Sequence, residues 1–264
     1  MIRRAIRAFV TGFSLLLLSL TAAAAQQETA EGIEHAKLRD IVNLKGEVFH
    51  VQGVDLDSRH IWVTSVDVAN SKGYLHQFDR ATGRFLRRLE LTDGARYHPG
   101  GISLHGASIW VPVAEYRSNS SAVIEEIDME TLQLRRKIPV ADHLGCVAVS
   151  DQAIVAGNWG SQSLYVFDPR SGKQVRMVPN PSATNYQDMK FDHGQLVAGG
   201  SLTPLTGAID WIDWPSMRVV RTVHAGATDR AISYTGEGMA LKGRDLFVIP
   251  EDGPARLFHF RLDA

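Results

Sequence analysis

The sequence has 264 residues, and its 28 lysines and arginines nearly balance its 29 aspartates and glutamates, for a formal net charge of −1. This balance gives no electrostatic footprint for a nucleic acid or an anionic membrane surface, so no nucleic-acid partner is expected. The single cysteine, Cys146, excludes an internal disulfide, so stability must come from an ordinary hydrophobic core.

The chain begins with the layout of a secretory signal peptide. Three arginines precede an apolar run over residues 8–20, and Ala23-x-Ala25 fits a signal-peptidase site. The run is shorter than the roughly 20 residues that span a bilayer, so no stable membrane anchor should remain after cleavage. We expect removal of residues 1–25, and a single domain over residues 26–264 in a periplasmic or secreted protein.

A repeated motif follows the leader. Apolar stretches that end in aspartate recur as YLHQFDRATG (74–83), VIEEIDMETL (123–132), SLYVFDPRSG (163–172) and AIDWIDWPSM (208–217), with a partial copy, RLFHFRLD, at 256–263. Two short strands precede each copy, and a turn and a basic-apolar strand follow each complete one. The unit is therefore four strands in about 45 residues, repeated five times, which is the signature of a β-propeller rather than a β-sandwich.

The last unit has three strands, and its missing fourth strand can come from the other end of the chain. AKLRDIVNL at 36–44 resembles the other fourth strands. Such a strand would close the ring and leave no open sheet edge. We therefore predict an all-β, five-bladed β-propeller of four-stranded blades, closed by an N-terminal strand that completes the last blade.

The recurring aspartates are expected to be structural. Each stands where a strand enters a turn, and there a carboxylate can accept hydrogen bonds from backbone N–H groups. The four in complete copies are Asp79, Asp128, Asp168 and Asp213.

The first strand of each unit should line the central channel. Alignment of VQGVDLD, PGGISLH, LGCVAVS, QDMKFDH and EGMALKG places one position of each at the same level: Gly53, Gly101, Gly145, Asp188 and Gly238. Glycine suits a crowded axis where strands converge. The stretch YHPGG (97–101) is then the point where the second unit enters the channel, and its histidine belongs to a ring of polar groups.

Polar residues gather just before that level and in the loops between second and third strands, which open on the same face. Convergent polar groups with an aromatic side chain are typical of a ligand site, although a wet channel also needs polar groups for hydration. The expected occupant is a small molecule or a metal, and the same face can serve a protein partner. The predicted ligand-binding residues are His50, Gln52, His98, Glu115, Arg117, His143, Asn158, Trp159, Gln187 and Glu251.

The blades resemble those of a known group. SLYVFDPRSGK (163–173) is similar to segments of the broad gluconolactonase/SMP-30, NHL and YVTN-like propeller group, and the stretch from HPGG to AEYRSNS (98–120) resembles an uncharacterised family of exported bacterial β-propeller proteins. The lactonase group has six blades and a central divalent metal held by acidic and asparagine side chains. The resemblance implies such a part for Glu237, Asp188, Asn185 and Asn158, whereas the count of five units departs from that group.

The sequence leaves open whether the protein is an enzyme. The first hypothesis is a non-catalytic protein that binds its ligand at the channel face. The second is a lactonase-like hydrolase in which His98, Asp188 and Glu237 hold a divalent cation, calcium or zinc. A glycosidase with axial carboxylates, including Asp142, ranks behind both. The sequence lacks GxSxG, HExxH and a GxGxxG-to-helix pattern, which favours binding over catalysis.

Overall fold

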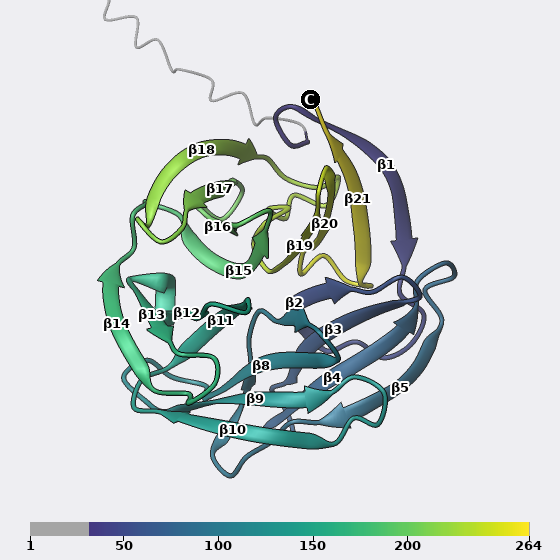
Figure 1. Ribbon diagram of the computed structural model, residues 1–264. Coiled ribbons are helices and arrows are strands. Elements are labelled where there is room, and N and C mark those ends of the chain that lie inside the picture. The colour runs from purple at the N-terminus through teal and green to yellow at the C-terminus, as the bar shows by residue number, and fades with distance from the viewer. Residues whose placement is uncertain (1–31, 264) are drawn as a thin grey trace, which may run out of the picture.

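Short alternating strands joined by tight turns build five antiparallel sheets around one axis (Figure 1). The computed structural model describes residues 32–263. The predicted all-β, five-bladed propeller is confirmed. The predicted signal peptide, residues 1–25, lies outside the described residues. Within the described part of the chain, no helix is long and apolar enough to cross a membrane.

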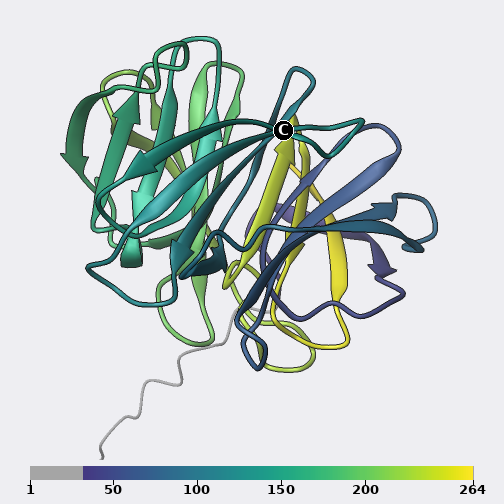
Figure 2. The same cartoon turned by 90° about the horizontal axis from the view of Figure 1, so that it is seen from below.

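Each blade starts with a strand at the axis and ends with a strand at the rim (Figures 1 and 2). Blade 2 has its first strand split in two, and a single 3₁₀ turn, η1 (Trp159–Ser161), interrupts blade 3. The strands are, in blade 1, β2 (His50–Leu56), β3 (His60–Asp67), β4 (Lys72–Asp79) and β5 (Phe85–Glu90); in blade 2, β6 (Arg96–Pro99), β7 (Ser103–His105), β8 (Ser108–Glu115), β9 (Ala122–Asp128) and β10 (Leu134–Val140); in blade 3, β11 (Leu144–Val149), β12 (Ile154–Asn158), β13 (Ser163–Phe167) and β14 (Gln174–Pro179); in blade 4, β15 (Asn185–Asp192), β16 (Gln195–Ser201), β17 (Gly207–Asp213) and β18 (Arg218–Ala225); in blade 5, β19 (Gly238–Lys242), β20 (Asp245–Ile249), β21 (Arg256–Leu262) and β1 (Ala36–Asn43).

The N-terminal strand completes the last blade, as the sequence predicted. β1 pairs antiparallel with β21, and the register sets Ile41 opposite Phe258 and Leu38 opposite Phe260. The pairing joins the two ends of the described chain in one sheet. It therefore covers the edge that the three C-terminal strands would otherwise leave open.

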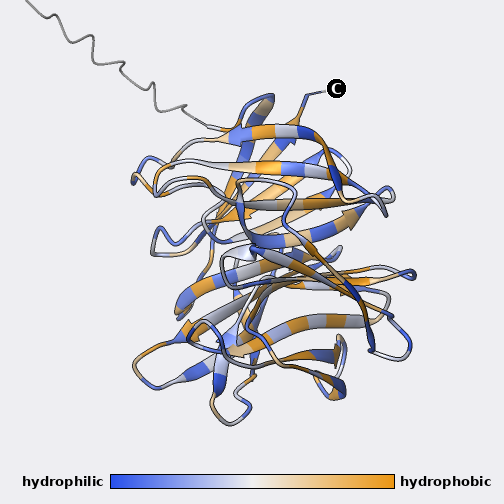
Figure 3. Cartoon of the chain, turned by 90° about the vertical axis from the view of Figure 1, so that its left-hand side faces the viewer, coloured by the Kyte–Doolittle hydropathy of each residue, from blue (hydrophilic) through white to orange (hydrophobic). Residues whose placement is uncertain are grey.

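The hydrophobic core is divided among the five gaps between neighbouring blades. Strands alternate apolar and polar residues, as the colouring of Figure 3 shows, and the apolar side chains of adjacent blades face one another. Between blades 1 and 2, for example, Trp62 and Leu75 pack with Ile102 and Ile109. Because each blade buries both of its faces in this way, closure of the ring stabilises every blade.

Close packing at the axis explains the glycines of the first strands. A Cβ added to Gly53 would lie 2.6 Å from the Cα of Gly101, and one added to Gly238 would lie 2.7 Å from the backbone nitrogen of Val54. One part of the alignment is wrong: Gly101 bridges to Cys146, so Cys146 and not Gly145 stands at the axial level of blade 3. Cys146 directly follows a β-bulge, as Gly53 and Asp188 do in their own first strands, so matching glycine to glycine placed blade 3 one residue too early.

The recurring aspartates act as turn acceptors, as predicted. Asp79 Oδ1 accepts from the backbone nitrogen of Thr82 at 2.9 Å, and Asp128 and Asp168 make the same contact in their own blades. Asp213 instead accepts from the hydroxyl of Ser216 at 2.5 Å. These carboxylates fix the turn between the third and fourth strands.

Candidate functional site

One mouth of the central channel holds a cavity of about 260 Å³ to which all five blades contribute. Seven of the ten predicted ligand-binding residues line it, together with Glu237, which the sequence assigned to a metal, and Asn185. The seven are His50, Gln52, His98, His143, Asn158, Trp159 and Gln187. We call this cavity, which these seven residues line together with Glu237 and Asn185, the mouth cavity.

β-bulges aim two glutamine side chains into the mouth cavity. In β2 the pairing with β3 skips Gln52, and in β15 the pairing with β16 skips Gln187. A bulged residue has no partner across the ladder, so its side chain can turn away from the regular alternation of the strand. The same device in blade 3 presents Gly145, which leaves room at that side of the mouth cavity.

Aromatic and imidazole rings form one wall of the mouth cavity. His98 stacks on Tyr116 with ring centroids 4.4 Å apart, and His143 meets the edge of Trp159 at 4.6 Å. Burial lowers the pKa of His98 to about 3, and the neighbouring His143 and His50 lower it further in the same direction. Nδ1 of His98 is buried without a hydrogen-bond partner among the described residues. The ring is therefore neutral at physiological pH and has one unsatisfied nitrogen.

His143 is held in place by backbone oxygens from the loop of blade 2. Its Nδ1 lies 2.9 Å from the carbonyl oxygen of Glu115 and 3.2 Å from that of Arg117. The side chains of these two predicted residues pair with each other at 2.8 Å and do not line the mouth cavity. Their contribution to the site is thus through the backbone. Burial lowers the pKa of His143.

A carboxyl group and an ion pair form the opposite wall. His50 Nδ1 lies 3.1 Å from a carboxylate oxygen of Glu251, and its Nε2 lies 3.8 Å from Glu237. The hydrogen bond to Glu251 raises the pKa of His50. Burial raises the pKa of Glu237 to about 8, since the opposing effect of His50 is smaller. Glu251 also accepts from the backbone nitrogen of Val51 and therefore supports this wall without lining the mouth cavity.

The raised pKa of Glu237 has a consequence for stability. A carboxyl group that holds its proton more tightly in the folded state than in the unfolded state loses stability as pH rises between the two pKa values. The raised pKa of His50 acts in the same direction. We expect the free energy of unfolding to fall from about pH 6.5 to about pH 8, by at most about 1.4 kcal/mol per pH unit for Glu237. Below about pH 6.5 the lowered pKa values of His76, His98 and His143 act in the opposite direction.

Glu237→Gln should flatten this decline in urea unfolding measured across that pH range. Asp151→Asn, a change at a carboxylate whose side chain is 95% exposed, serves as the control and should keep the slope of the parent. An unchanged slope in Glu237→Gln would show that this carboxyl ionises normally.

The metal hypothesis does not fit the arrangement of its proposed ligands. His98 and Glu237 line the mouth cavity, but Asp188 is fully buried at the axis and both of its oxygens are already bonded. Within residues 32–263, no group of three or more His, Cys, Asp or Glu side chains is placed to hold a metal ion. The structure thus does not bring these three side chains together as one ligand set, and the calcium or zinc site stays a prediction.

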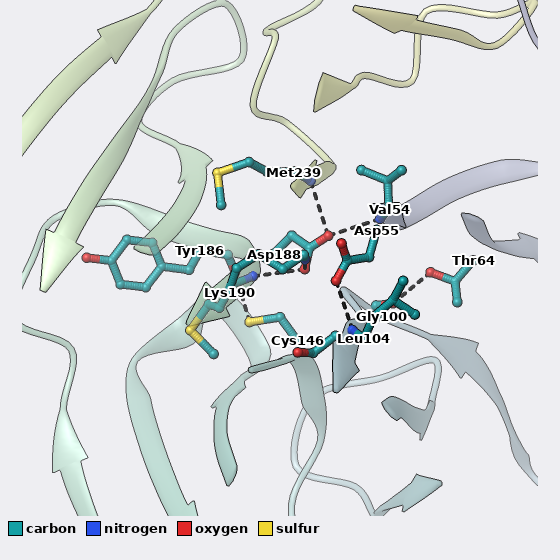
Figure 4. A network of polar contacts seen from close by, with 12 residues as sticks. Val54, Asp55, Thr64, Gly100, Leu104, Cys146, Tyr186, Asp188, Lys190 and Met239 are labelled. Atoms are coloured by element: carbon teal, nitrogen blue, oxygen red, sulfur yellow. Dashed lines mark hydrogen bonds and ion pairs between the residues drawn. The ribbon is translucent and has the colours of Figure 1, made fainter. Parts of the chain in front are cut away.

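Asp188 instead closes the axis (Figure 4). Its Oδ2 accepts from the backbone nitrogens of Val54 in blade 1 and Met239 in blade 5, at 3.0 and 3.1 Å. Its Oδ1 accepts from Lys190 Nζ at 2.5 Å and from the nitrogen of Met189 at 2.9 Å. This network ties three blades together and separates the mouth cavity from a second cavity, of about 250 Å³, that Lys190 lines at the other end.

Lys190 is the residue of this network that the sequence analysis missed. It is 3% exposed and belongs to the same strand as Asp188, two residues further on. That spacing places both side chains on one face of a strand. A lysine at this position of an otherwise buried first strand was the available signal.

A larger groove, of about 690 Å³, lies between blades 1 and 2. Its charged groups are largely satisfied by one another. Asp57 accepts from the ring nitrogens of His60 and Trp62, Asp128 pairs with Arg135, and Arg87 donates to a glutamine. The mouth cavity therefore remains the stronger candidate site, since its polar groups converge on open space.

These features define a five-bladed β-propeller with a polar cavity at one mouth of its channel, closed at its inner end by the axial network. Residues 41–181 match the model of a family of unknown function, DUF6454, and the chain belongs to that family. A search of curated proteins finds no match.

Two solved structures resemble the fold. The glutaminyl cyclase of Myxococcus xanthus shares 15% identity at a TM-score of 0.64, over 86% of this chain and 96% of that one. The WD40 domain of Neurospora crassa Pan2 shares 10% identity at a TM-score of 0.51, over 81% of this chain and 62% of that one. At these identities the likeness shows the propeller fold alone. The resemblance to the gluconolactonase/SMP-30 group stays a prediction.

Proposed function

We propose that this chain is an exported β-propeller that binds a small polar molecule in the mouth cavity. The observation that carries the proposal is the convergence of polar side chains from all five blades on one cavity of about 260 Å³. Hydration of a channel does not need such a set, and β-bulges that aim Gln52 and Gln187 inward are often found beside functional sites.

The fixed imidazole of His98 in the cavity wall supports a defined ligand. A buried polar atom without a partner costs roughly 1–3 kcal/mol, so each one in a native structure calls for an explanation. His98 is 8% exposed and stacks on Tyr116, which fixes its ring plane.

His98→Phe should abolish most of the binding, because phenylalanine keeps the stacking on Tyr116 and removes both ring nitrogens. The probes are hexoses, amino acids, nucleosides, organic acids and a peptide amide that begins with glutamine, titrated by calorimetry and ligand-observed NMR. We expect saturable 1:1 binding by at least one class, weakened about 10-fold or more in His98→Phe.

The matched control is His105→Phe, at the other end of the channel, where His105 pairs with Asp151. It should bind like the parent protein. The proposal is overturned if no class binds, or if both variants lose binding equally.

Catalysis at the same site is the second candidate, and the state of Glu237 favours it. A carboxyl group with a pKa of about 8 holds a proton at neutral pH and can donate it to a substrate or take it back. The fold shared with a glutaminyl cyclase makes the glutamine peptide a natural substrate to include. Mass spectrometry of the titration mixtures distinguishes turnover from binding alone.

A further inference from the structure

Most side chains of the mouth cavity are amides or imidazoles. Four are primary amides, Gln52, Asn158, Asn185 and Gln187, and three are imidazoles. Amides and neutral imidazoles both donate and accept hydrogen bonds. No lysine or arginine among the described residues lines this cavity. His50 is engaged with Glu251, and burial raises the pKa of Glu237 to about 8, so this carboxyl is protonated at neutral pH and also both donates and accepts. The rest of the wall is built from groups that suit an uncharged partner.

The charged groups near the mouth cavity are already paired. Glu251 bonds to His50, and Arg117 bonds to Glu115. The carboxylate of Asp142 accepts from Asn158 Nδ2 at 3.1 Å and from the hydroxyl of Tyr165 at 2.8 Å. An ionic ligand would have to break one of these pairs or remain without a counter-ion, and desolvation of an unpaired charge is costly.

The volume of the mouth cavity and the indole at its rim restrict the size and shape of the ligand further. A cavity of about 260 Å³ lies just below the about 300–1,000 Å³ of sites for drug-sized molecules, so it suits a single small ring. Trp159 lines it with 41% of the residue exposed, which leaves part of the indole free to cover the apolar face of a ligand.

We propose that the ligand is an uncharged, hydroxyl-rich ring of monosaccharide size, held by the amides and imidazoles of the mouth cavity and covered by Trp159. The inference rests on the proposed function and names its ligand class. Each hydroxyl of the ring can both donate and accept a hydrogen bond. It can therefore pair with an amide of the cavity wall or with the neutral imidazole of His98. The imidazole of His98 lines the cavity and is one group that such a hydroxyl can meet.

The closed axis limits how a larger carbohydrate can enter. Asp188 is 0% exposed and bonds blades 1 and 5 directly behind the mouth cavity. A chain of sugars cannot thread through the ring, so only its terminal unit can occupy the site. A free monosaccharide and the end of a glycan therefore share the same chemistry here.

The test is a series of rings that differ in charge. Calorimetry or ligand-observed NMR is run with D-glucose, D-galactose, D-mannose, D-glucosamine and D-glucuronate against the folded domain. We expect at least one neutral hexose to bind about 10-fold or more tightly than the amino sugar and the uronate. A charged ring that binds as tightly as the best hexose overturns the inference.

Two variants connect the result to the site. Gln187→Leu keeps the size of the side chain and removes the amide, and it should weaken the hexose about 10-fold, since a ligand hydroxyl loses its partner. Gln174→Leu makes the same change on an exposed position of β14 and should have no effect. Equal affinities of the two variants would contradict the proposal.

The remaining outcomes separate this inference from the proposed function. If an amino acid, nucleoside or organic acid binds in a His98-dependent way and no neutral hexose does, the ligand class is wrong and the proposed function stands. If nothing binds, both are wrong. If the protein binds the best hexose and an oligosaccharide that ends in it with equal affinity, it recognises the end of a glycan. If it binds the hexose and not the oligosaccharide, its ligand is a free sugar.

Discussion

Asp188→Ala is expected to lower the free energy of unfolding by about 3–5 kcal/mol, because it leaves a buried ammonium group without its counter-ion. Lys190 is 3% exposed and its Nζ bonds to Asp188 at 2.5 Å. The same change leaves the backbone nitrogens of Val54 and Met239 without acceptors at the axis. Urea unfolding measured by circular dichroism gives the difference.

The partner variant tests the reason for the loss. Lys190→Met removes the ammonium group, and in the double variant Asp188→Ala/Lys190→Met neither charge remains. The double variant should lose less stability than the sum of the two single changes, since residues in one ion pair are not additive. Asp151→Asn, on an exposed carboxylate, should change stability by less than about 0.5 kcal/mol. A loss below about 1 kcal/mol in Asp188→Ala would show that the axial network is not what holds the blades together.

The blade count and the closure of the ring could be predicted because both depend on a repeated local pattern. The aspartate turns recur with each unit, and β1 has the alternation of a fourth strand. Strand pairing within a blade joins neighbours in sequence, so the repeat determines it almost completely. The face of the ring that carries the mouth cavity could be predicted for the same reason, since equivalent loops of each unit open on that face.

The depth of each side chain along the axis could not be predicted. β-bulges add a residue to the first strands of blades 1, 2, 3 and 4 near the mouth, and each one shifts the register after it by one position. In blades 1, 3 and 4 the bulge directly precedes the axial residue, so the residue before that level lines the mouth cavity and the axial residue does not. Asp188 was therefore assigned to the ligand site, although it lies behind it, and Gly145 was given the place of Cys146.

The N-terminal segment is bonded to three blades and not only to its own. Its ladder with β21 lies in blade 5, Ile33 bridges to Ala225 at the end of blade 4, and the nitrogen of Lys45 donates to the carbonyl oxygen of Gly83 in blade 1. Most side chains of β1 are exposed, whereas Ile33 and Leu44 at its two ends are 5% exposed. The segment thus fastens the ring by backbone hydrogen bonds between two apolar anchors.

A chain that starts at Lys45 should consequently fail to form a cooperatively folded ring. The truncation exposes the edge of β21 and uncovers parts of the apolar clusters on both sides of blade 5, to which Ile33 and Leu44 belong. We expect loss of the cooperative thermal transition, or a fall in Tm of more than about 10 °C, which corresponds to several kcal/mol for a domain of this size. A chain that starts at Gly32 keeps every described residue of the segment and serves as the matched control.

A synthetic peptide of residues 32–45 keeps the prediction testable if the truncated chain does not fold alone. Added in excess, the peptide can pair with β21 and present Ile33 and Leu44 to their clusters, so it should restore a cooperative transition at a midpoint that rises with peptide concentration. A peptide with Ile33 and Leu44 both changed to aspartate should not restore it, because both anchors would bury a charge. A truncated chain that melts within about 1 °C of the control without any peptide would show that the ring does not need this strand to close.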